Sequence, residues 1–172
     1  IIDRVDMIFP YGYKEGLIYS QQALEVHGIT KETQDENSVP LKEIFKTCRD
    51  WFTKYKNPRQ MCTLAGHNIV SFDNAFLKNF FKFMGDDIDR YVKFYLDTMH
   101  IAHLSALEQM DYKLGTCCQL AGVDLVDAHR AQNDVDANAE LLISYIKKLR
   151  GEGQSELMNE KTVRYRESFQ LC

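Results

Sequence analysis

The chain lacks a surplus of positive charge, a long apolar run and any paired-cysteine motif. Its 172 residues include 21 Lys and Arg against 25 Asp and Glu, which gives a formal charge of −4. This balance excludes a protein that holds nucleic acid by bulk positive charge, but not a metal enzyme that meets phosphate through bound cations. No apolar run is long enough to span a bilayer, and residues 1–9 alternate with charges, unlike a signal peptide, so we expect no membrane partner.

The cysteine pattern argues against both a disulfide framework and a zinc site. The five cysteines are an odd number, Cys117 and Cys118 are adjacent, and no Cys-x-x-Cys occurs. We expect most of them to be small core residues of a protein in the cytoplasm or another reducing intracellular compartment.

Hydrophobic periodicity predicts alternating strands and helices in one domain. Apolar residues recur at helical spacing from Leu41 to Tyr55, and short apolar runs of strand length occupy residues 61–66 and 91–96. The other expected elements are a strand over 1–9, helices over 20–26, 73–83, 99–107 and 114–121, a last long helix ending at Leu149, and a polar loop over 31–39. This order is typical of an α/β fold in which helices cover a small mixed sheet. We assign residues 1–150 to this domain and 151–172 to a polar C-terminal tail.

The first group of candidate site residues follows the apolar run at 61–66. That run places His67 and Asn68 at the carboxyl end of a strand, and Asp73 at the start of the next helix. Sites of α/β folds lie at such strand-to-helix junctions. Taken alone, however, Asp73 is better explained as a capping residue that satisfies helix amides.

The second group is His129 and Asp134. Five residues on one helix turn through about 500°, so the two side chains would point about 140° apart. They converge only if His129 lies on the loop that leads into the helix, which the preceding sequence VDLVDA supports. Asp134 then faces inward, and Asp136 lies on the opposite, solvated side. Taken alone, His129 is equally well a surface loop residue.

Together the motifs are specific. The segments are HNIVSFDNAFL (67–77), LDT (96–98), YKL (112–114) and HRAQNDVDA (129–137). In this order and spacing, from Ile1 to about Leu149, the chain resembles the DEDDh branch of the DnaQ-like 3′→5′ exonuclease superfamily. The resemblance implies an RNase H-like fold, a mixed sheet flanked by helices.

The resemblance implies a two-metal nuclease. Members of the family hold two divalent ions, about 4 Å apart, on four carboxylates that flank the scissile phosphate. Two of these carboxylates correspond to Asp73 and Asp134. The general base corresponds to His129, which would take a proton from the attacking water. Carboxylate oxygens suit two Mg²⁺ or Mn²⁺ ions as cofactors.

Substrate-contacting residues are also implied by the resemblance. The loop His27-Gly28-Ile29 resembles one that is common among polymerase-associated members, whereas by chemistry alone His27 is a turn residue ahead of Gly28. Asn68 belongs to the same motif as Asp73, and Phe76 would border the nucleic-acid groove. The aromatic cluster around Phe76 is nevertheless expected to be mainly core; its members are Phe76, Phe80, Phe81 and Phe83.

One motif of the family is missing. The family's first strand carries an Asp-x-Glu that supplies the other two carboxylates, and no Asp of this chain has a Glu two residues later. Because Ile1 to Pro10 resembles the family's third strand, about 25–35 residues with two strands are expected before Ile1. We favour a chain that is part of a longer protein; a natural truncation that cannot cleave, or a partner chain that supplies the strands, are the alternatives.

These observations predict an enzyme that removes nucleoside 5′-monophosphates from the 3′ end of single-stranded DNA, or of RNA, in proofreading or trimming. The alternative is a catalytically inactive exonuclease-like module that binds nucleic acid or a polymerase partner. Asp97 is expected to cap the helix after Thr98 rather than bind metal. His100 and His103 are expected to be packing or surface residues.

Overall fold

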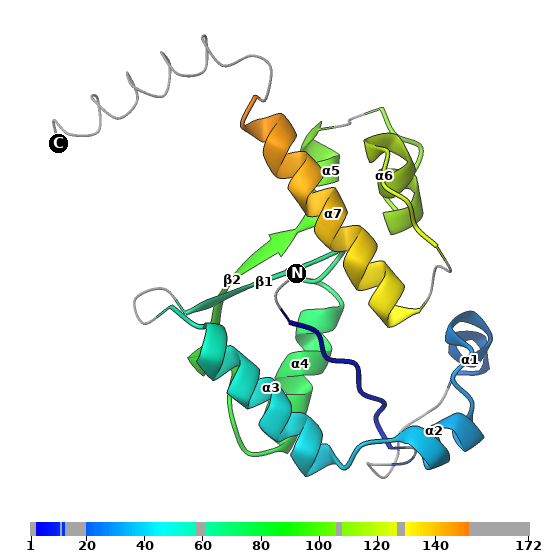
Figure 1. The fold of residues 1–172 in the computed structure, drawn as a ribbon, viewed down its shortest axis with the longest axis vertical. Helices are drawn as coiled ribbons and strands as arrows, with labels where there is room; N and C mark the ends of the chain where they lie inside the picture. The colour runs from blue at the N-terminus through cyan, green and yellow to red at the C-terminus, as the bar shows by residue number, and fades with distance from the viewer. Residues whose placement is uncertain are drawn as a thin grey trace, which may run out of the picture.

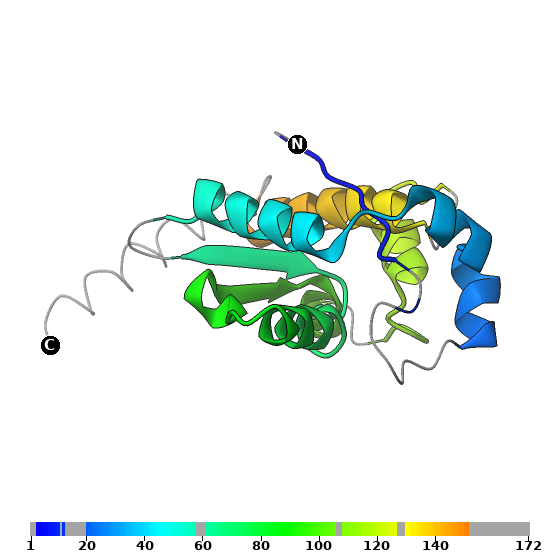
Figure 2. The same ribbon diagram turned by 90° about the horizontal axis from the view of Figure 1, so that it is seen from below.

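A computed structural model describes residues 3–10, 12, 20–57, 61–105, 108–126 and 130–151. Its centre is a parallel pair of strands, β1 (Cys62–Gly66) and β2 (Val92–Asp97), in which Ala65 pairs with Leu96 and Gly66 with Asp97. Helices cover both faces of this pair (Figure 2): α3 (Leu41–Tyr55) and α7 (Ala131–Leu149) lie on one face, and α4 (Asp73–Phe83) on the other. The α/β class is therefore as predicted. Of the three expected strands, the described residues form two.

The remaining helices are short. They are α1 (Gln21–His27), α2 (Lys31–Asn37), the 3-10 helix η1 (Ile88–Arg90), α5 (Thr98–Ser105) and α6 (Leu114–Ala121). Figures 1 and 2 place α1 and α2 beside the sheet, at the end where α7 begins. The helix α2 corrects the expected polar loop over 31–39: the Thr30 hydroxyl accepts a hydrogen bond from the Thr33 N–H and caps it. No helix in the described ranges is long and apolar enough to cross a membrane.

Buried side chains form two separate apolar clusters. The first cluster joins α3, α4, η1 and the strands; its buried residues are Ile44, Cys62, Phe80, Phe81, Ile88, Tyr91 and Val92. The second cluster joins α5, α6 and α7; its buried residues are Ala102, Cys117, Cys118, Ala137, Leu141 and Tyr145. Three of the four described cysteines are buried, as expected, and Cys48 is half-buried. The chain passes from the first cluster to the second where β2 ends and α5 begins.

The aromatic residues of α4 divide between core and surface. Phe80 and Phe81 are buried, and Phe80 packs edge-on against Phe9 with ring centroids 5.1 Å apart. Phe76 and Phe83 are exposed, so only half of the cluster that was expected to be mainly core is buried. At about 100° per residue, the buried face of α4 is centred between Phe80 and Phe81. Phe76 and Phe83 project about 40–60° beyond Phe80, on the side away from Phe81, and so lie at the margin of that face.

The N-terminal segment is not a strand of the sheet. Residues 3–9 run between α3 and α7 (Figure 1), with a single bridge from Ile8 to Ser38. Asp3 accepts hydrogen bonds from Lys54 and Tyr55 of α3, and Arg4 pairs with Asp136 of α7. The predicted strand over 1–9 is wrong over the described residues, because an extended segment forms a strand only where a free strand edge faces it.

Candidate active site

The loop between β1 and α4 is a tight turn held by special backbone positions. Gly66 ends β1, and a Cβ added there would lie 2.8 Å from the Cβ of Ile69. Asn68 has a φ of 60°, a left-handed conformation that Asn tolerates better than most residues. The turn continues through hydrogen bonds from Phe72 N to Asn68 O and from Asn74 N to Ile69 O. The sequence therefore places Asp73 at the first residue of α4, as predicted.

Both ring nitrogens of His67 have partners. Nε2 lies 2.8 Å from the carbonyl oxygen of Tyr112, to which it donates, and Nδ1 lies 2.9 Å from the Thr98 hydroxyl. The imidazole thus joins the end of β1 to the start of α5 and to the segment before α6. His67 therefore has a structural role in this fold.

Asp97 is a buried carboxylate that accepts three backbone hydrogen bonds. Its Oδ1 accepts from Asn68 N at 2.8 Å and from Met99 N at 3.0 Å, and its Oδ2 accepts from Val70 N at 3.2 Å. Asp97 is 5% exposed. The bond to Met99 confirms the predicted cap of α5. The two bonds to the β1–α4 loop were not foreseen, because Asp97 and Asn68 are 29 residues apart.

Asp73 carries a perturbed carboxyl group. Burial of this group is the main cause that raises its pKa; its own backbone N–H opposes the rise, and the negative charge of Asp97 adds to it. A cation bound next to a carboxyl group with a raised pKa would favour its ionised form and lower that pKa.

Asp134 lies in the first turn of α7 and is half-buried. Burial raises the pKa of the Cys118 thiol in α6 to about 11, and the charges of Cys117, Asp134 and Glu140 add to the rise. Asp134 therefore acts on the side of α7 that faces α6. Asn138, one turn later on the same face, is buried, with its Oδ1 2.6 Å from the Thr98 hydroxyl.

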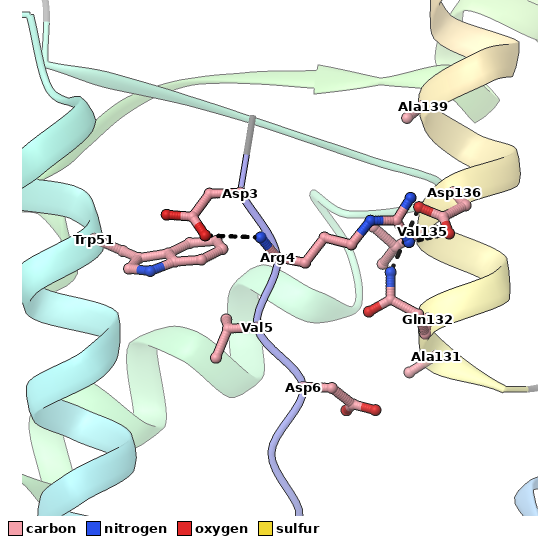
Figure 3. A pocket seen from close by; sticks show the side chains of 10 residues that line it. All are labelled: Asp3, Arg4, Val5, Asp6, Trp51, Ala131, Gln132, Val135, Asp136 and Ala139. Atoms are coloured by element: carbon pink, nitrogen blue, oxygen red, sulfur yellow. Dashed lines mark hydrogen bonds and ion pairs between the residues drawn. The ribbon is translucent and has the colours of Figure 1, made fainter. Parts of the chain in front are cut away.

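Asp136 lies on the other side of α7, next to a cavity of about 200 Å³. Figure 3 shows its carboxylate with Arg4 and Gln132, in a cavity bordered by the N-terminal segment and by Trp51 of α3. The expectation that Asp136 is merely solvated is wrong, because Arg4 pairs with it. Neither Asp73 nor Asp134 lines this cavity.

A second, more open groove of about 500 Å³ lies at the carboxyl end of β1. His67, Asn68, Met99, His103, Tyr112, Lys113 and Leu114 line it. His103 is exposed and stacks on Tyr112 with ring centroids 3.6 Å apart. His100 is also exposed, so both histidines are surface or packing residues, as expected. Asn68 is thus accessible from this groove.

The other expected substrate contacts are at the surface. His27 ends α1, and its Nδ1 accepts a hydrogen bond from Ile29 N at 2.9 Å. Gly28 between them has a φ of 67°, the left-handed conformation that ends many helices. Phe76 is 64% exposed and packs against Phe72, which is 58% exposed, with ring centroids 5.0 Å apart. This exposed aromatic pair was not foreseen as a pair.

The described residues offer the right type of ligand for divalent cations, but too few of them. Asp73 and Asp134 offer carboxylate oxygens, the ligands that Mg²⁺ and Mn²⁺ prefer. However, no group of three or more His, Cys, Asp or Glu side chains in the described ranges could hold a metal ion. His129, the expected general base, lies outside the described residues. The two carboxylates would need further ligands.

Comparison with known proteins identifies the family. A family model described as an exonuclease, RNase_T, matches residues 13–142. A PolC-type DNA polymerase III of Bacillus cereus is 28% identical over 128 residues, which cover 74% of this chain and 8% of that protein. A 3′-5′ exonuclease DinG of Staphylococcus aureus is 32% identical over 110 residues, which cover 63% of this chain and 12% of that protein. The chain therefore spans a small part of these relatives, and it belongs to the exonuclease family of the DnaQ-like superfamily.

Proposed function

We propose that the chain is part of a DEDDh-type 3′→5′ exonuclease that releases nucleoside 5′-monophosphates from single-stranded DNA or RNA. The observation that carries the proposal is the exonuclease family match over residues 13–142, which contains Asp73, His129 and Asp134. The order of their motifs is that of the family. The reaction serves proofreading or trimming, beside a polymerase or another nucleic-acid-processing protein.

Each of the three residues has a proposed role. Asp73 and Asp134 bind two Mg²⁺ or Mn²⁺ ions together with an upstream Asp-x-Glu. When bound, such ions activate water and stabilise the leaving oxygen. His129, on the loop before α7, takes a proton from the attacking water, since a neutral imidazole is a suitable base near pH 7.

Groups at the surface suit the substrate. Asn68 lines the open groove at the end of β1, and Phe72 and Phe76 form an exposed aromatic pair at the start of α4. Aromatic faces bind unpaired bases by stacking in a sequence-tolerant way. The loop His27-Gly28-Ile29 supplies contacts to the 3′ terminus.

The test uses the chain extended upstream with a segment that bears Asp-x-Glu. Asp134→Asn removes the negative charge of a proposed metal ligand, and His129→Ala removes the proposed base. Each substitution is expected to lower turnover of a 3′-labelled oligonucleotide by about 10²–10⁴-fold near pH 7. Asp136→Asn is the matched control, because Asp136 pairs with Arg4 on the other side of α7, and it should retain activity. Near-wild-type hydrolysis by His129→Ala would refute the assignment of His129.

The second candidate is a catalytically inactive module that binds nucleic acid or a polymerase. It is the interpretation that holds if no Asp-x-Glu completes the ligands of Asp73 and Asp134. The turnover assay, combined with a measurement of oligonucleotide binding, separates the two: binding without hydrolysis by the extended chain supports the inactive module.

A further inference from the structure

The two candidate metal-binding residues lie on helices that pack into different apolar clusters. Asp73 begins α4, whose Phe81 is fully buried in the first cluster. Asp134 lies on α7, whose Leu141 is fully buried in the second cluster. Packing within one cluster fixes the helices of that cluster. The relative position of Asp73 and Asp134 therefore depends on the contacts that join the clusters.

Asp97 and Thr98 lie where the clusters meet, at the end of β2 and the start of α5. Asp97 reaches the loop that bears Asp73, through its bonds from Asn68 N and Val70 N. These bonds have a charged acceptor in a buried setting, where hydrogen bonds are strongest. The Asp97 side chain thus joins the β1–α4 loop to the end of β2, in addition to the pairing of β1 with β2.

Thr98 reaches the helix that bears Asp134. Its hydroxyl, 0% exposed as a residue, lies 2.6 Å from Asn138 Oδ1, 2.9 Å from His67 Nδ1 and 3.3 Å from Gly66 O. One buried oxygen therefore contacts both the end of β1 and the middle of α7. Asn138 is four residues after Asp134, so both project from the same face of α7.

We propose that Asp97 and Thr98 together form a positioning junction that holds the loop bearing Asp73 against the helix bearing Asp134. The inference rests on the proposed function, since it treats both aspartates as parts of one metal centre. A valine would fill the space of Thr98 without a buried hydroxyl to satisfy, so packing alone does not account for threonine here. Hydrogen bonds are directional, so the contacts of the Thr98 hydroxyl fix the position of α7 along and around its axis relative to the end of β1.

The test exploits the shape of threonine in the chain extended upstream with a segment that bears Asp-x-Glu, which completes the proposed metal ligands. Thr98→Val keeps the shape and removes the hydroxyl, and Thr98→Ser keeps the hydroxyl. Thr116→Val is the matched control, because the Thr116 hydroxyl bonds Asp111 at 2.7 Å at the start of α6, away from the junction. Circular dichroism confirms that each variant is folded at the temperature used.

The readout is the broadening of amide NMR signals by Mn²⁺ alone. In the extended chain with the wild-type Thr98, amides near Asp73 and near Asp134 should broaden with one common half-saturating Mn²⁺ concentration. Thr98→Val should separate the two responses and raise that concentration by about 10-fold or more, the usual effect of removing a group that orients metal ligands. Thr98→Ser and Thr116→Val should behave as the wild type. A mere loss of stability would not change Mn²⁺ binding by the folded chain.

The outcomes are distinguishable. A common, unchanged Mn²⁺ response in Thr98→Val would overturn the positioning role and leave the proposed function intact. Independent responses at the two aspartates in the wild type would overturn the shared metal centre, and the inference with it. Should Thr98→Val fail to fold, Asn138→Ala removes the partner on α7 but leaves the contact with His67, and the same measurement decides.

Discussion

Replacement of Asp97 by Asn should destabilise the chain by about 3–5 kcal/mol. An Asn in the same pose keeps Oδ1 for the N–H groups of Asn68 and Met99, but these become bonds to a neutral acceptor, weaker by roughly 1 kcal/mol each. Its Nδ2 would face the Val70 N–H, which donates to Oδ2 in the wild type, so donor meets donor at a cost of about 1–3 kcal/mol. Because Asp97 is 5% exposed, water compensates little.

The assay is urea unfolding followed by the fluorescence of Trp51, the single tryptophan. Asp111→Asn is the matched control: Asp111 accepts from Lys113 N at 3.1 Å and from the Thr116 hydroxyl at the start of α6, in a more exposed setting. We expect it to lose about 1 kcal/mol or less. Hydrogen exchange of the Asn68 amide should accelerate in Asp97→Asn and not in the control. Equal losses in the two variants, with unchanged exchange at Asn68, would refute the account of Asp97.

Three further predictions concern stability and reactivity. Gly66→Ala should lower the free energy of unfolding by about 1–3 kcal/mol in urea, because its Cβ would meet the Ile69 Cβ at 2.8 Å; an unchanged midpoint would contradict the tight turn. Alkylation of Cys118 at pH 8 should be roughly 100-fold slower in the native than in the unfolded chain, because a thiol with a pKa of about 11 is rarely ionised at that pH; equal rates, followed by mass spectrometry, would contradict its burial. The Tyr91 hydroxyl, the Asp87 N–H and Arg90 lower the pKa of Asp86 in the folded chain. The ionised Asp86 therefore contributes its full stabilisation above the ordinary pKa of 3.8, and this contribution is lost as the pH falls through the lowered pKa of the folded chain. The stability difference between wild type and Asp86→Asn should therefore shrink between pH 6 and pH 2 in urea titrations, and a constant difference would exclude this linkage.

Regular elements with a strong apolar period were predictable from the sequence. The stripe from Leu41 to Tyr55 gave the helix α3 with both ends correct, and the short apolar run before His67 gave β1. The segment 31–39 was expected as a loop because it has no apolar stripe, yet Thr30 caps a helix there. Local capping outweighed the absence of a buried face.

Contacts between residues that are far apart in the sequence were not predictable. The strand expected over residues 1–9 depended on a partner strand, and the described residues 3–9 instead pair their charges with α3 and α7. The motif around Asp73 gave its place at the start of α4, but not the role of Asp97, which is 24 residues later and appeared only as a helix cap. The bond between Thr98 and Asn138 has no sequence signal beyond the position of Asn138 one turn after Asp134.

The central claim is that these residues are part of a 3′→5′ exonuclease whose metal ligands are completed by an upstream Asp-x-Glu. The most direct measurement is Mg²⁺-dependent release of mononucleotides from a labelled oligonucleotide, by the 172-residue chain and by the chain extended with such a segment. With two carboxylates, Mg²⁺ stays mostly hydrated, so we predict little or no release by the chain alone and restored release by the extended chain, abolished by Asp134→Asn. Robust degradation by the chain alone, absent in its Asp134→Asn variant, would contradict the proposed source of the ligands; no degradation by the extended chain would contradict the exonuclease itself.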